Sequence, residues 1–123
     1  AEEIYAEYGI RLLTGDGGIV FAGVKNRGEG SCAVGEIQVE QVMEDSAVRF
    51  SCFQVLGGSG LLTMEIPAAF NVRSGEDSLR VTVRDTDGTE KVLDVAADAT
   101  RYVGFEAASE VARTTLVELR IQP

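Results

Sequence analysis

The chain contains no histidine and no tryptophan, and it has only two cysteines among its 123 residues. Without histidine there can be no Ser-His-Asp triad, no Cys-His dyad and no imidazole ligand for zinc, copper or haem. A pH switch based on imidazole titration is excluded as well, and two cysteines are too few for a Cys₄ zinc site. Catalysis by this chain would have to use carboxylates, tyrosines, lysines or hydroxyl groups. We expect no cofactor and no bound metal ion.

Long apolar runs and an excess of positive charge are also missing. The apolar stretches, such as residues 19–24, have the length of a strand and fall well short of the roughly 18–20 residues that span a bilayer. Acidic side chains outnumber basic ones by 20 to 11, which gives a net charge of −9. Nucleic acids and anionic membranes bind basic patches. We therefore expect no nucleic-acid partner and no membrane insertion, and a neutral or cationic partner instead.

Length and composition are those of one globular domain that comprises residues 1–123. Hydrophobic residues make up 45% of the chain and charged residues 25%, which is ordinary for a folded protein. A chain of this length buries a core without help from a metal ion. The sequence contains no internal repeat and no linker that would divide it.

Apolar and polar residues alternate along most of the chain, which is the pattern of half-buried β-strands. The strands are expected at residues 4–12, 19–25, 36–40, 48–53, 61–66, 79–84, 91–95, 99–105 and 115–122. Pro67 ends one strand, and the residues after it continue in an extended conformation. In the last strand, Val117, Leu119 and Ile121 are predicted to point inward.

Turn residues predict two hairpins. Residues 15–18 (Gly-Asp-Gly-Gly) would join the strand at 4–12 to the strand at 19–25, and an Asp-Gly turn at residues 85–89 would close the second hairpin. Residues 105–112 favour a short helix or a loop.

These segments predict an antiparallel β-sandwich of about eight or nine strands with one short helix at most. No helical stretch is long enough for a parallel crossover. An immunoglobulin-like arrangement is one form that such a sandwich takes, although the Cys…Trp…Cys pattern of antibody domains is absent. A closed β-barrel is the alternative.

The two cysteines, Cys32 and Cys52, are predicted to form a disulfide that closes a loop of about 20 residues and adds roughly 3 kcal/mol of stability. Two buried free thiols are the alternative. A disulfide, together with a chain that begins Ala-Glu-Glu without methionine, favours a mature exported protein after removal of a signal peptide. The preference for arginine over lysine is typical of a GC-rich bacterial genome.

Two acidic motifs are candidate functional sites. Residues 85–90 (Asp-Thr-Asp-Gly-Thr-Glu) resemble the start of a calcium loop, but position twelve would be Ala96, and we favour an ordinary turn. Glu36 and Glu40 share a strand face about 13 Å apart, which is too far for the carboxylate pair of a glycosidase. A carboxylate-based hydrolase is the least favoured function.

Glycine-rich loops and exposed aromatic residues are the candidate binding elements. The loops are residues 26–35 and 57–60, with Arg27 and Glu29 as contact residues. The aromatic candidates are Tyr5, Phe53, Tyr102 and Phe105, which are predicted to lie on outer faces or in an irregular segment. Packing within the sandwich, or a face assignment shifted by one residue, is the alternative for these aromatics.

The sequence thus predicts an exported, non-catalytic sandwich that uses its glycine-rich loops to contact a protein or a cell-surface component. The first alternative is a protease inhibitor whose loop around Cys32 is held rigid by the disulfide. The second is a module that binds a small molecule or a carbohydrate in a cleft.

Overall fold

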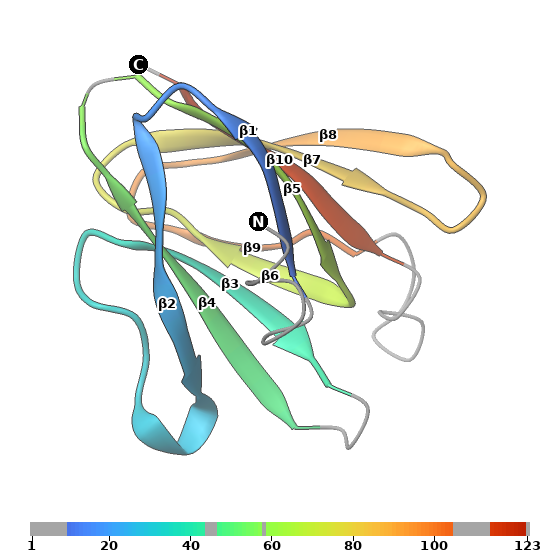
Figure 1. The fold of residues 1–123 in the computed structure, drawn as a ribbon, viewed down its shortest axis with the longest axis horizontal. Helices are drawn as coiled ribbons and strands as arrows, with labels where there is room; N and C mark the ends of the chain where they lie inside the picture. The colour runs from blue at the N-terminus through green and yellow to red at the C-terminus, as the bar shows by residue number, and fades with distance from the viewer. Residues whose placement is uncertain (1–9, 44–46, 58, 105–113, 123) are drawn as a thin grey trace.

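The computed structural model describes residues 10–43, 47–57, 59–104 and 114–122, which form ten strands in two antiparallel five-stranded sheets (Figure 1). The first sheet consists, in spatial order, of β1 (Arg11–Gly15), β5 (Leu61–Pro67), β10 (Thr115–Gln122), β7 (Ser78–Arg84) and β8 (Glu90–Val95). The second sheet consists of β2 (Ile19–Asn26), β4 (Val48–Val55), β3 (Ile37–Val42), β6 (Ala69–Arg73) and β9 (Thr100–Tyr102).

The predicted β-sandwich is confirmed. Every strand pairing of the described residues lies within one sheet, so the sheets do not close into the barrel that was the alternative. The additional strand is β6, because Ala68 adopts a positive φ of 55° and turns the chain from β5 into the opposite sheet. The helical structure of the described residues is one 3₁₀ turn, η1 (Arg27–Glu29). None of their helices is long and apolar enough to cross a membrane.

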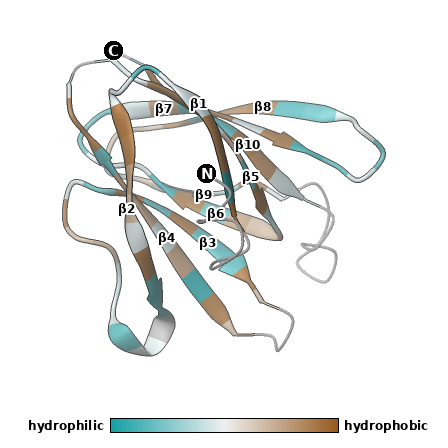
Figure 2. Cartoon of the chain, in the orientation of Figure 1, coloured by the Kyte–Doolittle hydropathy of each residue, from teal (hydrophilic) through white to brown (hydrophobic). Residues whose placement is uncertain are grey.

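Apolar side chains from both sheets meet in one core between the layers. Strands of both sheets carry hydrophobic residues, as Figure 2 shows, and the buried ones from the two sheets belong to one cluster. The largest fully buried side chains include Phe53, Ile37, Met64, Leu79 and Leu119. Each such side chain contributes on the order of 1.5–3 kcal/mol when it is removed from water.

The second predicted hairpin is confirmed. Strands β7 and β8 pair from Leu79 opposite Val95 to Arg84 opposite Glu90. In the turn, Asp85 Oδ1 accepts a hydrogen bond from the Thr86 backbone N–H, and Asp87 Oδ1 accepts one from that of Thr89. Gly88 has a φ of +90°, which glycine adopts without strain. The acidic motif therefore forms the ordinary turn that the sequence favours.

The first predicted hairpin is wrong. Strand β1 pairs with β5 in the first sheet, whereas β2 pairs with β4 in the second. Residues 15–18 connect the first sheet to the second, and hydrogen bonds to the start of β5 hold them in that path. Asp16 Oδ1 accepts hydrogen bonds from the N–H groups of Gly18 and Leu61. The predicted strand began at residue 4, and its first six residues lie outside the described residues.

The face assigned to Phe53 from the sequence is also wrong. Phe53 is fully buried in the core, where its ring meets that of Phe21 edge-on with the centroids 5.7 Å apart. Phe50 and Cys52 point to the opposite side of β4, where they form a small cluster with Cys32 and Val48. Both faces of β4 carry a phenylalanine and other apolar residues, so alternation alone could not decide which one is inside.

In β10 and β3 the buried residues differ from those that the sequence predicts. The register of β10 shifts between Leu116 and Glu118, so Leu116 is buried in place of the predicted Val117. In β3, Gln38 of the expected polar face of residues 36–40 is buried, and so is Gln41, which lies on the face of Ile37 and Val39. Gln41 Nε2 donates a hydrogen bond to the Pro67 carbonyl, and Gln38 Oε1 accepts one from the Cys32 N–H.

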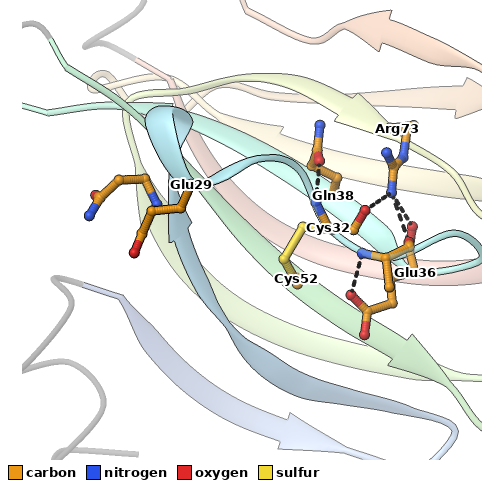
Figure 3. Close-up of a disulfide and its surroundings, with 8 residues drawn as sticks. Glu29, Cys32, Glu36, Gln38, Cys52 and Arg73 are labelled. Carbon is orange, nitrogen blue, oxygen red and sulfur yellow. Dashed lines mark hydrogen bonds between the residues drawn. A yellow bond between two sulfur atoms is a disulfide. The ribbon is translucent and has the colours of Figure 1, made fainter.

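The predicted disulfide is confirmed. Cys32 and Cys52 are bonded with their Cα atoms 5.5 Å apart, and both are buried on the outer side of the second sheet. The bond joins the glycine-rich segment between η1 and β3 to the middle of β4 (Figure 3).

Candidate functional site

Of the aromatic candidates, the structure describes Phe53 and Tyr102, and these two do not share a surface. Tyr5 and Phe105 lie outside the described residues, and Phe53 is in the core. Tyr102, on β9, has a relative exposure of 40%, but its ring lies so close to Gly104 that a Cβ there would collide with it. Tyr102 therefore packs against its own chain with part of its surface.

The two glycine-rich loops meet over only part of their length. Arg27 and Glu29 belong to η1, which follows Asn26, the residue opposite Arg49 at the start of β4. Gly57 follows the other end of β4, about 25 Å away at the rise of an extended strand. Figure 3 likewise shows Glu29 apart from Cys32 and Glu36. Residues 26–35 thus run along the second sheet, and only their last part approaches Gly57.

Where the loops do meet, they enclose a cleft of about 320 Å³. It is lined by Gly35 from the segment before β3, by Val55, Leu56 and Gly57 at the end of β4, and by Glu76 and Asp77 between β6 and β7. We call these residues, together with the adjacent Val34, the loop-end surface. Val34 has a relative exposure of 103% and Leu56 of 63%. The exposed Leu56 thus lines an acidic cleft, and the exposed Val34 is the chain neighbour of Gly35, which also lines it.

Val34 lies at the tip of a tight turn. The Glu36 N–H donates a hydrogen bond to the Ala33 carbonyl at 3.1 Å, and Gly35 has a φ of +88°. This is the geometry of a type II turn, which needs glycine at its third position and leaves the second residue outside. The backbone therefore directs Val34 into solvent.

A disulfide and five hydrogen bonds hold this turn in place (Figure 3). The disulfide attaches Cys32 to β4, and Gln38 Oε1 accepts a hydrogen bond from the Cys32 N–H at 2.9 Å. Glu36 Oε1 accepts one from the Ala33 N–H at 3.0 Å. Arg73 of β6 donates from Nη2 to the carbonyls of Cys32, Ala33 and Glu36 at 3.1–3.3 Å. A segment with little regular structure is thus rigidly attached to the sheet.

The other two sides of the cleft are anchored as well. The Leu56 N–H donates to the Gly18 carbonyl at 2.8 Å, and Asp16 binds the N–H groups of Gly18 and Leu61. These N–H groups stabilise the carboxylate and lower the pKa of Asp16 below its ordinary value of 3.8. Gly75, next to Glu76, packs so tightly on the Gly35 carbonyl that a Cβ would collide with it.

The carboxylate of Glu36 and both sulfur atoms near this surface already form bonds within the chain. The carboxylate of Glu36, one of the two considered for a catalytic pair, accepts the hydrogen bond from the Ala33 N–H that stabilises the turn. One group of possible metal ligands lies in the described ranges, namely Cys32, Glu36 and Cys52, with ligand atoms within 4.8 Å of one another. Because both sulfurs belong to the disulfide, they are not the thiolates that a zinc ion requires.

The edges of the sheets offer the other common surface for a protein partner, since a strand can be added there. Pairing is irregular at both β1 and β2, between Leu12 and Thr14 and between Phe21 and Gly23. The third edge strand, β9, has three residues, and at the fourth, β8, Arg101 Nη1 donates to the Asp94 carbonyl. Irregular, short or covered edges discourage strand addition, so the loop-end surface is the better candidate.

Sequence reasoning missed most of this surface. Val34 and Gly57 lie within the loops that the sequence singled out, but Leu56, Glu76, Asp77 and the anchoring Arg73 do not. The available signal was an apolar Ala-Val pair inside a segment otherwise made of glycine and polar residues. Nothing in the local sequence indicates that Glu76 lies beside Gly35. The chain matches no protein-family model, and no curated protein shows significant similarity to it.

Proposed function

We propose that this chain is an exported, non-catalytic interaction module that binds a protein or a cell-surface component through the loop-end surface. The observation that carries this proposal is Val34, a fully exposed apolar side chain on a turn held by a disulfide and by Arg73. Because the Val34 side chain is fully exposed, it buries no apolar area that would stabilise the chain. Its turn is nevertheless held by many bonds.

Rigid attachment is what a binding surface gains from such bonds. Ordering a loop on association costs free energy, and a loop that is already ordered avoids that cost. Leu56 offers a second apolar contact beside the same cleft. A few side chains that become fully desolvated at the centre of an interface supply most of the binding energy.

The disulfide is compatible with an extracytoplasmic location, where such bonds persist. Secretion itself, a bacterial source and an immunoglobulin-like strand arrangement stay predictions from the sequence. A contact through Arg27 and Glu29 also stays a prediction. Glu29 accepts a hydrogen bond from the Asn26 N–H at the far end of the second sheet, away from the loop-end surface.

The first alternative from the sequence involves the loop around Cys32, and the second a cleft whose residues the sequence does not specify. A substrate-like protease inhibitor presents an extended segment, but Val34 lies in a tight turn, which weighs against this function. A small-molecule or carbohydrate site needs a cavity of roughly 300–1,000 Å³. The volume of the cleft is at the lower end of that range. Its carboxylates, Glu76 and Asp77, are neighbours in one loop and do not come from separate elements.

The proposal is tested by site-specific photo-crosslinking in the medium and cell envelope of the producing organism. The variants are Val34→p-benzoylphenylalanine and Leu56→p-benzoylphenylalanine. The matched control is Val92→p-benzoylphenylalanine, because Val92 is similarly exposed but lies on β8. We expect the first two variants to crosslink the same partner and the control not to do so.

The partner identified in this way is then purified and its affinity measured by calorimetry. Val34→Asp should weaken binding about tenfold or more, as for a central apolar contact. Val92→Asp should leave binding unchanged, and both variants should keep the wild-type melting temperature to within a few degrees. Equal crosslinking from position 92, or full affinity of Val34→Asp, would refute a binding role for this surface.

A further inference from the structure

The loop-end surface carries a second pattern, which is its charge. The cleft is lined by two carboxylates, Glu76 and Asp77, and none of its lining residues is basic. Backbone hydrogen bonds bring further acidic residues to the same end. The Asp98 N–H donates to the Gly75 carbonyl, and Asp16 is joined through Gly18 to Leu56.

The positive groups near this end are already engaged. Arg73 directs Nη2 at three carbonyl oxygens beneath the turn. Arg120 is 3.6 Å from Glu118 and also acts on Asp16, whose pKa it helps to lower. Hydrogen bonds to neutral carbonyls leave the charge of Arg73 in place. The carboxylates of Glu76, Asp77, Asp98 and Asp16 nevertheless outnumber these two guanidinium groups, in a protein whose net charge is −9, so the field at the cleft is negative. Such a field attracts cationic groups and repels acidic ones.

We infer that the partner supplies a lysine or arginine side chain flanked by apolar residues, and that this basic side chain enters the cleft lined by Leu56, Glu76 and Asp77. The inference rests on the proposed function. Lysine and arginine have apolar stems and charged heads. The stem would lie along Leu56 and the head would reach the carboxylates, while a neighbouring apolar residue of the partner would contact Val34.

The inference is tested with three synthetic peptides that differ only at the central residue. They are acetyl-Gly-Leu-Lys-Leu-Gly-amide and its versions with norleucine and with glutamate in place of lysine. The blocked ends leave the central residue as the sole charge. Binding to the ¹⁵N-labelled protein is followed by backbone amide shifts, which detect weak association and show where it occurs.

We expect saturable shifts at Gly35, Leu56 and Gly57 with the lysine peptide. Binding should fall by about fivefold to tenfold when NaCl is raised from 20 to 500 mM, because salt screens exposed charges. Glu76→Gln combined with Asp77→Asn should weaken binding by about the same factor. The matched control, Glu90→Gln with Asp94→Asn, removes the same charge from β8 and should have no effect.

Each other outcome has a definite meaning. If the norleucine peptide binds as well as the lysine peptide, the surface still binds apolar groups, so the inference fails and the proposed function stands. If the glutamate peptide binds best, or no peptide shifts these amides, the inference fails as well. The crosslinking experiment decides the proposed function separately, because it uses the natural partner.

Discussion

The two faces of β4 differ in how they hold the molecule together. On the inner face, Phe53 contacts Phe21 and belongs to a core that both sheets supply. On the outer face, the buried cluster is limited to Cys32, Phe50 and Cys52, with Val48 packed against it. The inner face gains its stability from apolar area, whereas so small an outer cluster buries little.

The difference shows what the disulfide contributes. An isolated apolar cluster of this size could not order the long segment that leads from η1 to β3. A covalent bond restricts that segment in the unfolded chain, and the hydrogen bonds of Arg73 and Gln38 orient it in the folded one. The core therefore builds the sandwich, and the outer bonds shape the loop-end surface on it.

The largest expected effect comes from the inner face. Phe53→Ala should lower the free energy of unfolding by about 3–5 kcal/mol, because it removes a fully buried ring and leaves a cavity. The matched control is Phe50→Ala on the outer face of the same strand, which should cost distinctly less. Urea denaturation followed by fluorescence or circular dichroism measures both. Equal losses would show that the two faces do not differ as described.

Removal of the disulfide should have the next largest effect. The double variant Cys32→Ala with Cys52→Ala is expected to lose about 3 kcal/mol, the amount for a loop of this length. Hydrogen exchange should accelerate at Ala33 and Val34 but not at Ile37 or Val39 in the core strand. Dithiothreitol should destabilise the wild type and leave the variant unaffected. A loss below about 1 kcal/mol would mean that the hydrogen bonds alone hold the segment.

The smallest expected effect concerns Asp16, which anchors the cleft electrostatically. Its pKa is lower in the folded than in the unfolded chain, because the N–H groups of Gly18 and Leu61 stabilise the carboxylate. Its contribution to stability is therefore present above the unfolded pKa and is lost as the pH falls through the folded pKa. Carboxyl NMR should show a titration midpoint below 3.8.

The control for this prediction is Asp16→Asn, which lacks the titrating group. The stability difference between wild type and variant should shrink as the pH is lowered from 5 to 2. Parallel stability profiles over that range would contradict the assignment, because they would show that protonation of Asp16 does not change the stability of the fold.

Local patterns decided much of the fold. The period-two alternation of Leu79, Val81 and Val83 predicts a strand that needs no tertiary context, and the Asp-Gly turn at residues 85–89 predicts its partner. The pairing of Cys32 with Cys52 follows from parity, because no other cysteine exists. Short-range rules suffice where strand, turn and strand follow one another directly.

Long-range contacts decided the rest. The Gly-Asp-Gly-Gly segment at residues 15–18 resembles a hairpin turn, but the N–H of Leu61 binds Asp16 and directs the chain across the sandwich. The binding surface was largely invisible for the same reason. Gly35, Leu56 and Glu76 are separated by about 20 residues each, and only the packing of three loops brings them together.

The sequence by itself determined the class of fold, the disulfide and the chemistries that a chain without histidine lacks, because these depend on composition and on periods of a few residues. The tertiary structure alone decided which face of β4 is inside. Alternation distinguishes two faces, but both carry a phenylalanine, and the partner sheet covers the one with Phe53. It also decided that Gly35, the neighbour of the exposed Val34, lines a cleft with Glu76 and Asp77, since that arrangement depends on contacts between distant parts of the chain.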